Sequence, residues 1–231
     1  SVRLAIIVPY RSQPEQNRQE QLGRFVVDMG AFLKTLAVEK YRVFVIEQSA
    51  DGRKFNRGML LNVGAKLAIK GGYNALCFHD VDLVPDQALK GFYEMSPERA
   101  PVHPGWSWKH YTYDTYVGGI LTLSQAHFKL VNGYPNNFWG WGGEDDEIYA
   151  RMQRAKLPER VKPGDHLAGR VVDLEDVIKA EKGGGMRAGA KLAEGGKMEF
   201  RNMRKKEARR ESNATWRTNG LANLQFRQLG Q

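Results

Sequence analysis

Two acidic motifs contain the side chains best suited to chemistry. The first is Asp80-Val81-Asp82, which places two carboxylates at i and i+2 directly after the apolar run Ala75–His79. If that run is a buried strand, the motif lies at its carboxyl end, where open α/β sheets bind ligands. Carboxylate oxygens there suit a hard divalent cation such as Mn²⁺ or Mg²⁺ bound to a diphosphate. A solvated acidic turn is the alternative interpretation, because an isolated Asp-x-Asp is common in proteins.

The second motif, FWGWGGEDDE, runs from Phe138 to Glu147. Glycines flank its tryptophans and give them no packing partner, so a loop that offers an indole face to a sugar explains the composition better than a core does. The carboxylates of this motif are consecutive: Glu144, Asp145, Asp146 and Glu147. One carboxylate can take a proton from an attacking hydroxyl, and others can accept hydrogen bonds from sugar hydroxyls. A helix N-terminus is the alternative; it explains the acids but not the tryptophans.

A third and weaker signal is Phe55-Asn56-Arg57. An aromatic ring at Phe55 can stack on a base, and the guanidinium of Arg57 can bind phosphate. An arginine on an exposed helix surface would look the same in the sequence, so this motif alone decides nothing.

These motifs need a scaffold that brings strand ends together. Short apolar runs predict strands at Arg3–Pro9, Tyr41–Ile46 and Ala75–His79, of which the first and the third are expected to be buried. Apolar residues spaced i, i+3, i+4 predict helices between them, from Leu22 to Leu36 and from Asn56 to Ile69. Strands that alternate with helices indicate an α/β fold with a mostly parallel central sheet flanked by helices.

The second half of the chain is less regular. We expect a strand at Tyr116–Leu123, a short helix at Ser124–Val131 and a helix from Gly143 to Arg154. The segment from Gly183 to Gly196 has six glycines among fourteen residues. A packed element cannot carry that much glycine, so this segment is expected to be a mobile loop.

Composition and charge limit the class of protein. The chain has 231 residues, of which 42% are hydrophobic, so a largely disordered chain is excluded. Its net charge of +9 favours anionic partners. Nine basic and three acidic residues lie between Lys197 and Gln231, where a solvated basic helix at Phe200–Arg210 is the simplest interpretation. No nucleic-acid-binding motif accompanies this charge, so we expect no nucleic acid partner.

Cysteine content and hydropathy add two expectations. Cys77 is the one cysteine, so no intrachain disulfide is possible. No apolar run reaches the roughly 18 residues of a transmembrane helix. We therefore expect membrane attachment only through an anchor that is not part of this chain.

Together the motifs resemble those of the beta-1,4-galactosyltransferases. The segments FNRxxLLNVG, HDVDL, YVGGI and FWGWGGEDDE occur in the order found in that family, and the likeness extends from Val8-Pro9-Tyr10-Arg11 to Asn219–Leu224. The stretch Tyr116–Tyr149 is most similar to the branch that galactosylates xylose in the proteoglycan linker. The resemblance implies one GT-A (Rossmann-like) catalytic domain over residues 1–231. Its nucleotide-binding half would be 1–82, and its acceptor-binding half 83–231, with a mobile Gly-rich loop at about 176–196.

The resemblance also implies a reaction. The chain would transfer galactose from UDP-galactose to a sugar hydroxyl of a glycan or glycoconjugate, inverting the anomeric centre and forming a β-1,4 linkage, with Asp145 as general base. Tyr116 matches the position where an aromatic ring favours galactose over N-acetylgalactosamine, because the ring leaves less room for the acetamido group. The donor-binding residues would be Pro9, Tyr10, Arg11, Arg18, Phe55, Arg57, Asp80, Val81, Asp82, Tyr116, Trp141, Gly143 and Glu144. The acceptor-binding residues would be Tyr113, Tyr116, Trp141, Asp145 and Asp146.

The expected metal site departs from the family pattern. The family completes a Mn²⁺ site with a histidine-containing segment, whereas the corresponding stretch here, Val172–Asp176, contains no histidine. We expect Asp82, Asp173 and Glu175 as ligands, with His166 a weaker candidate. An oxygen-rich site would accept Mg²⁺ more readily than a histidine site does. An exposed helix start is the alternative for Asp173 and Glu175.

Three other interpretations stay open on the sequence alone. The first is a non-catalytic glycan-binding module on the same fold, and the second is a transferase for UDP-glucose or UDP-GalNAc. The third is a protein that binds anionic polymers through its basic C-terminal part. The family is mostly Golgi-luminal, so the Golgi lumen is the expected compartment, and a bacterial or viral enzyme would be cytoplasmic. Ser12–Gln16 looks inserted relative to the family, so Arg18 would supply a second phosphate contact.

Overall fold

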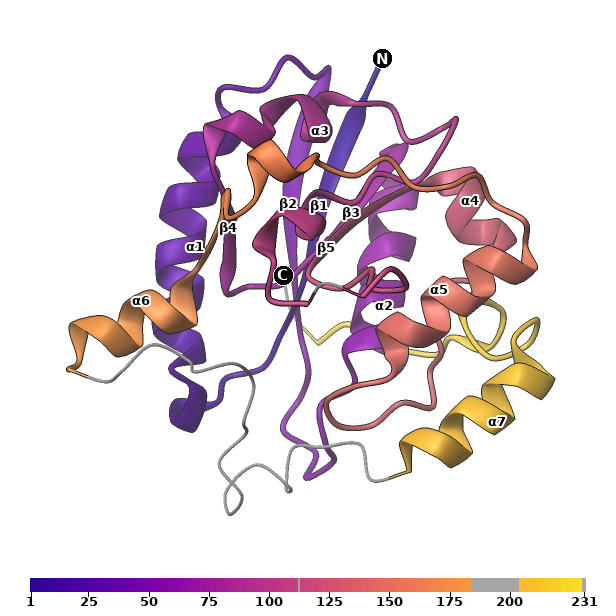
Figure 1. Cartoon of the computed structure of the whole chain (residues 1–231). Helices are drawn as coiled ribbons and strands as arrows, with labels where there is room; N and C mark the ends of the chain where they lie inside the picture. The colour runs from indigo at the N-terminus through magenta and orange to yellow at the C-terminus, as the bar shows by residue number, and fades with distance from the viewer. Residues whose placement is uncertain (112, 184–203, 230–231) are drawn as a thin grey trace.

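A mixed, mostly parallel sheet of four strands forms the centre of the molecule (Figure 1). The computed structural model describes residues 1–111, 113–183 and 204–229. The strands lie in the order β2-β1-β3-β5, with bounds β1 Arg3–Tyr10, β2 Lys40–Glu47, β3 Ala75–His79 and β5 Ile120–Ser124. β1 runs parallel to both β2 and β3, whereas β5 pairs antiparallel with β3. The α/β class expected from the alternating pattern is confirmed.

Alternate residues of β1 enter two different apolar layers. Leu4, Ile6 and Val8 pack against α1 (Arg18–Leu33) and α3 (Lys90–Glu94). Ala5 and Ile7 pack on the other face, which is covered by three helices: α2 Arg57–Lys70, α4 Gln125–Leu130 and α5 Glu144–Arg154. Successive side chains of a strand point to opposite faces, so the continuous apolar run from Leu4 to Val8 is what a sheet covered on both sides requires.

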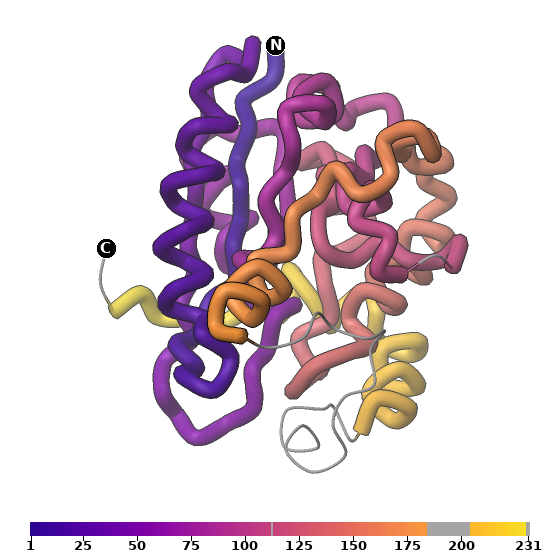
Figure 2. Tube along the Cα trace, turned by 60° about the vertical axis from the view of Figure 1, so that its left-hand side comes forward, coloured from indigo at the N-terminus to yellow at the C-terminus, as the bar shows by residue number. Residues whose placement is uncertain are grey.

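A small second sheet ties the chain after β3 to the chain before α6. β4 (Leu83–Pro85) pairs antiparallel with β6 (Val171–Asp173), which leads directly into α6 (Leu174–Glu181). The Leu174 amide donates to the Asp82 carbonyl at 2.7 Å. α6 lies against α1 (Figure 2), and Arg24 of α1 donates to Glu181 at 2.9 Å. The first acidic motif and the start of α6 are therefore held side by side.

The C-terminal part covers the α5 side of the molecule. α7 (Lys205–Thr215) lies beside α5 in Figure 1, on the side opposite α1. The remaining short helices are η1 Pro14–Gln16, η2 Gln87–Leu89, η3 Pro104–Trp108, η4 Asp165–Leu167 and η5 Leu221–Asn223. Among the helices of the described residues, none has both the length and the apolar character needed to cross a bilayer.

Most expected elements are present, and some bounds were wrong. The strand expected at Tyr116–Leu123 begins only at Ile120, because Gly119 adopts φ +75° and the Ile120 amide donates back to Gly118. The helix expected to reach Leu36 ends at Leu33. The loop expected at about 176–196 begins in helix instead, since α6 extends to Glu181; its part from 184 onward lies outside the described residues. The basic helix expected at 200–210 runs from Lys205 to Thr215, and 200–203 also lie outside them.

Candidate active site

One arginine joins the two acidic motifs. Arg57, the first residue of α2, donates from Nε to Asp80 Oδ1 at 2.7 Å and from Nη1 to Asp145 Oδ1 at 2.8 Å. Its Nη1 also lies 3.7 Å from Glu144 Oε1. Asn56 caps the start of α2, because its side chain accepts a hydrogen bond from the Met59 amide. This cap fixes the position of Arg57 at the first turn of the helix. The carboxyl end of β3 and the first turn of α5 thus meet at a single guanidinium.

The carboxyl groups around Arg57 share a poorly hydrated region. The pKa of Asp80 is raised to about 6: burial raises it most, the charges of Asp82 and Asp145 also raise it, and Arg57 opposes the shift. Burial likewise raises the pKa of Glu144 to about 7, together with the neighbouring charges of Asp145 and Asp80. Burial lowers the pKa of Arg57, but the surrounding carboxylates outweigh it and the net pKa is well above the usual value. Perturbed groups gathered in this way are typical of functional sites.

Two glycines allow the first turn of α5, Glu144–Glu147 (the acidic turn), to come close to Arg57. A Cβ at Gly118 would lie 2.6 Å from Asp145 Oδ2, so only glycine lets the loop before β5 pass the carboxylate. Gly143 precedes α5 with φ +105°, and a Cβ there would lie 2.8 Å from the Phe138 ring. A backbone with positive φ favours glycine. The glycines of the second motif therefore set the start of α5 and the direction of its carboxylates.

Two of the expected metal ligands, Asp82 and Glu175, act on the charge of another arginine. Arg18, at the start of α1, donates from Nη1 to Asp82 Oδ2 at 2.8 Å. Burial lowers the pKa of Arg18, but Asp82, Glu175 and Asp80 outweigh it and raise the pKa overall. Within the described residues, no three His, Cys, Asp or Glu side chains stand close enough together to hold a metal ion as placed. The donor chemistry nevertheless fits a cation, because several carboxylates converge on the positive charge of Arg18.

Asp173 and Glu175 lie at a helix start, but not at an exposed one. Asp173 ends β6 and caps α6: its Oδ1 accepts from the Glu175 amide at 2.9 Å and the Asp176 amide at 3.3 Å. Both side chains are about nine-tenths buried, and Lys179 forms an ion pair with Glu175. His166 lies in η4 and is exposed. The pairing of Leu83 with Asp173 brings the latter next to the first acidic motif.

The first nucleotide-binding candidates lie at the carboxyl end of β1 and directly after it. Pro9 and Tyr10 end that strand, and Tyr10 is buried, as is Val81. The guanidinium of Arg11 lies 5.5 Å from the centre of the Phe55 ring and donates to the Arg53 carbonyl at 2.8 Å. Beside them, an open hollow of about 380 Å³ is lined by Ser12, Pro14, Asn17, Arg18, Gln19 and Glu20. Arg18 therefore borders both this hollow and the first acidic motif.

Aromatic rings flank the acidic turn on its other side. Tyr116 is buried; its ring lies 5.6 Å from that of Tyr113 and 5.0 Å from that of Tyr111. Tyr113 is half exposed, and burial together with Asp146 and Asp145 raises its pKa to about 12. Trp141 is 59% exposed, and the Gly140 amide beside it donates to the Phe55 carbonyl at 2.8 Å.

Several supporting residues were not expected from the sequence. His103 and Arg160 hold the loop of Gly118: His103 Nε2 bonds to the Gly118 carbonyl at 3.1 Å, and Arg160 Nη2 donates to the Asp114 carbonyl at 2.6 Å. Lys205 Nζ lies 3.0 Å from Asp146 Oδ2. A buried polar residue in an apolar stretch is a usable signal for His103, whereas nothing in the sequence marks Lys205.

Comparison with known proteins gives matches over most of the chain. A family model described as the N-terminal region of glycosyl transferase group 7 matches residues 1–94, and one described as the N-terminal domain of galactosyltransferase matches residues 105–174. Beta-1,4-galactosyltransferase 7 of Drosophila melanogaster is 41% identical over 170 residues, covering 70% of this chain and 49% of that protein. The human protein of the same name is 42% identical over 159 residues, covering 67% and 45%.

A solved structure agrees in fold. A crystal structure of a mutant of the Drosophila enzyme in complex with manganese, UDP-Gal and xylobiose has a TM-score of 0.67 and 34% identity, covering 79% of this chain and 74% of that chain. The chain spans about half the length of the curated relatives it matches.

Proposed function

Because the chain belongs to the β-1,4-galactosyltransferase family, glycosyltransferase family 7, we propose that it transfers galactose from UDP-galactose to a sugar hydroxyl. The reaction inverts the anomeric centre, forms a β-1,4 linkage and depends on a divalent metal. The observation that carries this proposal is the contact of Arg57 with Asp80 and Asp145, since it brings a donor-side motif and a candidate base together.

Asp145 is the proposed general base. Its Oδ1 accepts a hydrogen bond from Arg57, its Oδ2 lies beside Gly118, and about a quarter of the side chain is exposed. The acceptor hydroxyl gives its proton to this carboxylate while its oxygen bonds to the anomeric carbon of galactose and the bond to UDP breaks. A positioned carboxylate of this kind contributes roughly 10²- to 10⁴-fold to the rate. Glu144 and Asp146 are proposed to accept hydrogen bonds from sugar hydroxyls.

Cationic and aromatic residues are proposed to bind the donor. Phe55 stacks on the uracil, with Arg11 beside it, and Arg57 and Arg18 face the diphosphate. Guanidinium groups suit this task because their planar forks match phosphate oxygens. The remaining donor contacts are proposed at the positions expected from the sequence: Pro9, Tyr10, Asp80, Val81, Tyr116, Trp141 and Gly143.

The metal site is proposed at Asp82, Asp173 and Glu175. These carboxylates would hold Mn²⁺, with Mg²⁺ as the alternative, and a divalent ion supplies neutralisation of the departing diphosphate. Support comes from the convergence of carboxylate charge on Arg18 and from the relative crystallised with manganese. Asp173 contributes in addition as the cap of α6.

The acceptor is proposed to be a glycan whose terminal sugar lies against Tyr113, Tyr116 and Trp141. Two of these rings lie within 5.6 Å of each other beside the acidic turn, and the relative in the crystal carries xylobiose. For the compartment, we propose the Golgi lumen, as in most of the family; fluorescence imaging of the tagged full-length protein against a Golgi marker tests it.

A donor screen tests the proposed function. UDP release is measured with UDP-galactose, UDP-glucose and UDP-GalNAc, with xylobiose as acceptor, in Mn²⁺, Mg²⁺ or EDTA. We expect release from UDP-galactose that depends on both acceptor and metal, and its loss in Asp145→Asn. Glycan binding that ignores EDTA and UDP-galactose, with no UDP release, would instead favour a non-catalytic binding module. Equal release by wild type and Asp145→Asn would remove Asp145 as base.

A further inference from the structure

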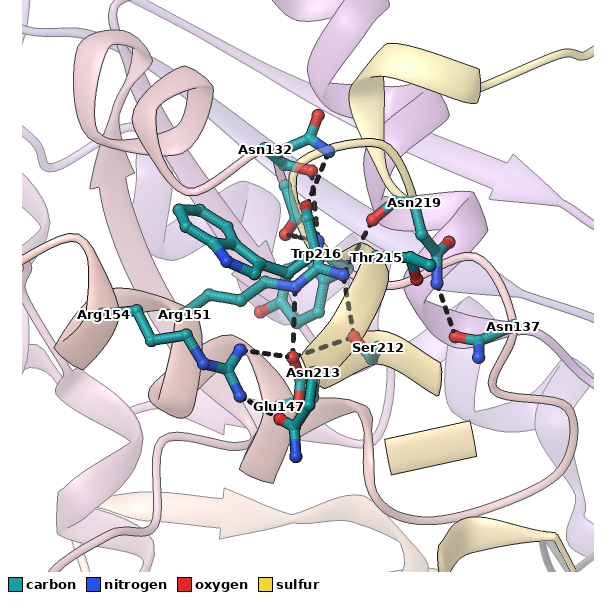
Figure 3. Close-up of polar contacts among 12 residues, drawn as sticks. Asn132, Asn137, Glu147, Arg151, Arg154, Ser212, Asn213, Thr215, Trp216 and Asn219 are labelled. Carbon is teal, nitrogen blue, oxygen red and sulfur yellow. Dashed lines mark hydrogen bonds and ion pairs between the residues drawn. The ribbon is translucent and has the colours of Figure 1, made fainter. Parts of the chain in front are cut away.

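α7 lies beyond both matched family segments, yet it is fixed rigidly to the helix that carries the acidic turn. The family segments end at residue 174, and α7 begins at Lys205. Ser212 of α7 is fully buried, and its hydroxyl donates to Glu147 Oε1 of α5 at 2.8 Å. Arg151, also fully buried, donates from Nη2 to Ser212 Oγ at 3.0 Å and to the Asn219 carbonyl at 2.7 Å (Figure 3).

The same network anchors the chain that follows α7. Asn219 Nδ2 donates to Asn137 Oδ1 at 2.8 Å, and Asn132 Nδ2 donates to the Trp216 carbonyl at 2.9 Å (Figure 3). Breaking a buried charged network of this kind is costly. α7 therefore keeps a fixed position relative to the site, and is more than the solvated basic helix suggested by its composition.

The first residue of α7 reaches the proposed acceptor side of the site. Lys205 Nζ lies 3.0 Å from Asp146 Oδ2. A Cβ on Gly143 would lie 3.0 Å from Cγ of Lys205, so the aliphatic part of the lysine runs beside the start of α5. α7 thus borders the acidic turn directly.

The charges of α7 are separated between its two sides. With 3.6 residues per turn, Lys205, Arg209, Lys206 and Arg210 follow one another round one side, and Glu207 and Glu211 occupy the other. Contacts agree with this placement: Asn213, on the basic side, bonds to Arg154 of α5, whereas Glu211 accepts from Asn137 at 3.0 Å. Lys206, Arg209 and Arg210 are exposed and form no ion pair with a residue that the structure describes.

From this arrangement we propose that the basic side of α7 extends the acceptor site and binds carboxylate or sulfate groups of an anionic acceptor glycan. This rests on the proposed function, since it places the reacting sugar at Asp145 and the charged neighbour of that sugar on α7. Lys205 marks where the two regions join. Arginine side chains favour carboxylate and sulfate groups because their forks bind two oxygens at once.

A matched pair of acceptors tests this. The probes are xylobiose and a xylobiose whose second xylose carries glucuronic acid, assayed at low salt with UDP-galactose and Mn²⁺. We expect the acidic sugar to have a KM at least fivefold lower in the wild type. The triple variant Lys206→Ser, Arg209→Ser, Arg210→Ser should lose this preference, with its kinetics on neutral xylobiose unchanged. A control triple removes the same charge elsewhere, at the exposed residues Lys34, Arg42 and Lys129, and should keep the preference.

Several outcomes would overturn the inference. The wild type would show no preference for the acidic sugar, or the α7 triple would keep it, or both triples would lose it equally. Loss of heparin binding in the α7 triple without any change in acceptor KM would assign the helix to polyanion binding away from the reaction. If the wild type turns over neither sugar, the proposed function fails, and the same comparison is then made by saturation-transfer NMR of the two sugars with UDP and Mn²⁺ present.

Discussion

Arg57 donates to Asp145 at 2.8 Å across 88 residues of chain. Since the same guanidinium binds Asp80 at 2.7 Å, the two acidic motifs lie close together at the carboxyl end of β3. The charges of Asp82 and Asp145 both act on Asp80, so metal-binding and proton-accepting candidates share one region. A transferase needs this arrangement, because the donor diphosphate and the acceptor hydroxyl must meet within bonding distance.

Replacing Arg57 should damage both activity and stability. Arg57→Ala leaves several poorly hydrated carboxylates without their counterion, so we expect unfolding to become easier by about 3 kcal/mol and kcat/KM to fall by about 100-fold. Arg57→Lys keeps the charge but cannot bind two carboxylates with a rigid fork, so its effects should be intermediate. Urea denaturation and UDP release measure these effects. The exposed Arg42→Ala is the control; an equal effect there would contradict the assignment.

The pKa of Glu144 predicts how stability depends on pH. Burial raises this pKa from 4.5 to about 7, so the folded protein binds more protons than the unfolded chain between these values. The contribution of Glu144 is therefore fully present below about pH 4.5 and is lost as the pH rises through about 7. His103 acts in the opposite direction: burial lowers its pKa to about 3, so its contribution is lost as the pH falls below 6.5.

Glu144→Gln isolates the first effect. The difference in unfolding free energy between wild type and variant, measured by urea denaturation from pH 4.5 to 8, should change steadily in favour of the variant as the pH rises. A difference that stays constant over this range would mean that Glu144 titrates normally in the folded protein.

The fold was predictable where the pattern of apolar residues is local. Ala75–His79 was placed without error, and the position of Asp80 after it followed from the rule for strand ends. The loop at Tyr116–Gly119 was assigned to a strand because its residues are apolar or small. Its actual conformation depends on the close approach of Gly118 to Asp145. These two residues are far apart in the sequence, so a local pattern of apolar residues cannot predict their contact.

The charge pairs of the site could not be predicted from periodicity. Arg18 was expected to bind phosphate, and the sequence gives no sign that it would contact Asp82, 64 residues away. A solvated helix was expected only as far as Arg210, because the residues up to there are mostly charged, and Ser212 was not included in it. The Ser212 hydroxyl can be buried because it forms hydrogen bonds with Arg151 and Glu147 of α5. These bonds depend on how α5 and α7 pack, which the sequence pattern does not show.

Activity should depend on the carboxylates around Arg18. Asp82→Asn is expected to raise the Mn²⁺ concentration for half-maximal activity by at least about tenfold. Loss of a residue that only supports a metal ligand already lowers metal affinity by roughly that factor. Asp173→Asn separates two roles, since asparagine also caps a helix well: α6 should stay intact while the Mn²⁺ requirement rises. Mn²⁺ titrations of UDP release after EDTA treatment measure both. An unchanged requirement in Asp173→Asn would leave Asp173 as a helix cap alone.

Gly118→Ala should reduce catalysis more than stability. The added Cβ would lie 2.6 Å from Asp145 Oδ2 and 2.7 Å from the Tyr116 ring, so the carboxylate must move. A displacement of about 1 Å at a reacting group can cost about 100-fold in rate, and we expect a fall in kcat of at least about tenfold. Gly30→Ala in α1 is the matched control, because nothing lies within 4 Å of its added Cβ. Equal kcat values for the two variants would contradict the proposed position of Asp145.

Tyr116 should set the choice of donor sugar. Its ring is buried beside His103 at 5.7 Å and next to the Gly118 loop, so it cannot withdraw to make room for an acetamido group. Tyr116→Leu removes part of the ring, and we expect the ratio of kcat/KM for UDP-GalNAc to that for UDP-galactose to rise by at least about tenfold, as loss of a steric contact permits. Tyr113→Leu, at a half-exposed residue, should change the acceptor KM and leave this donor ratio alone. If both variants keep the wild-type ratio in UDP-release assays, galactose selectivity must come from another part of the donor site.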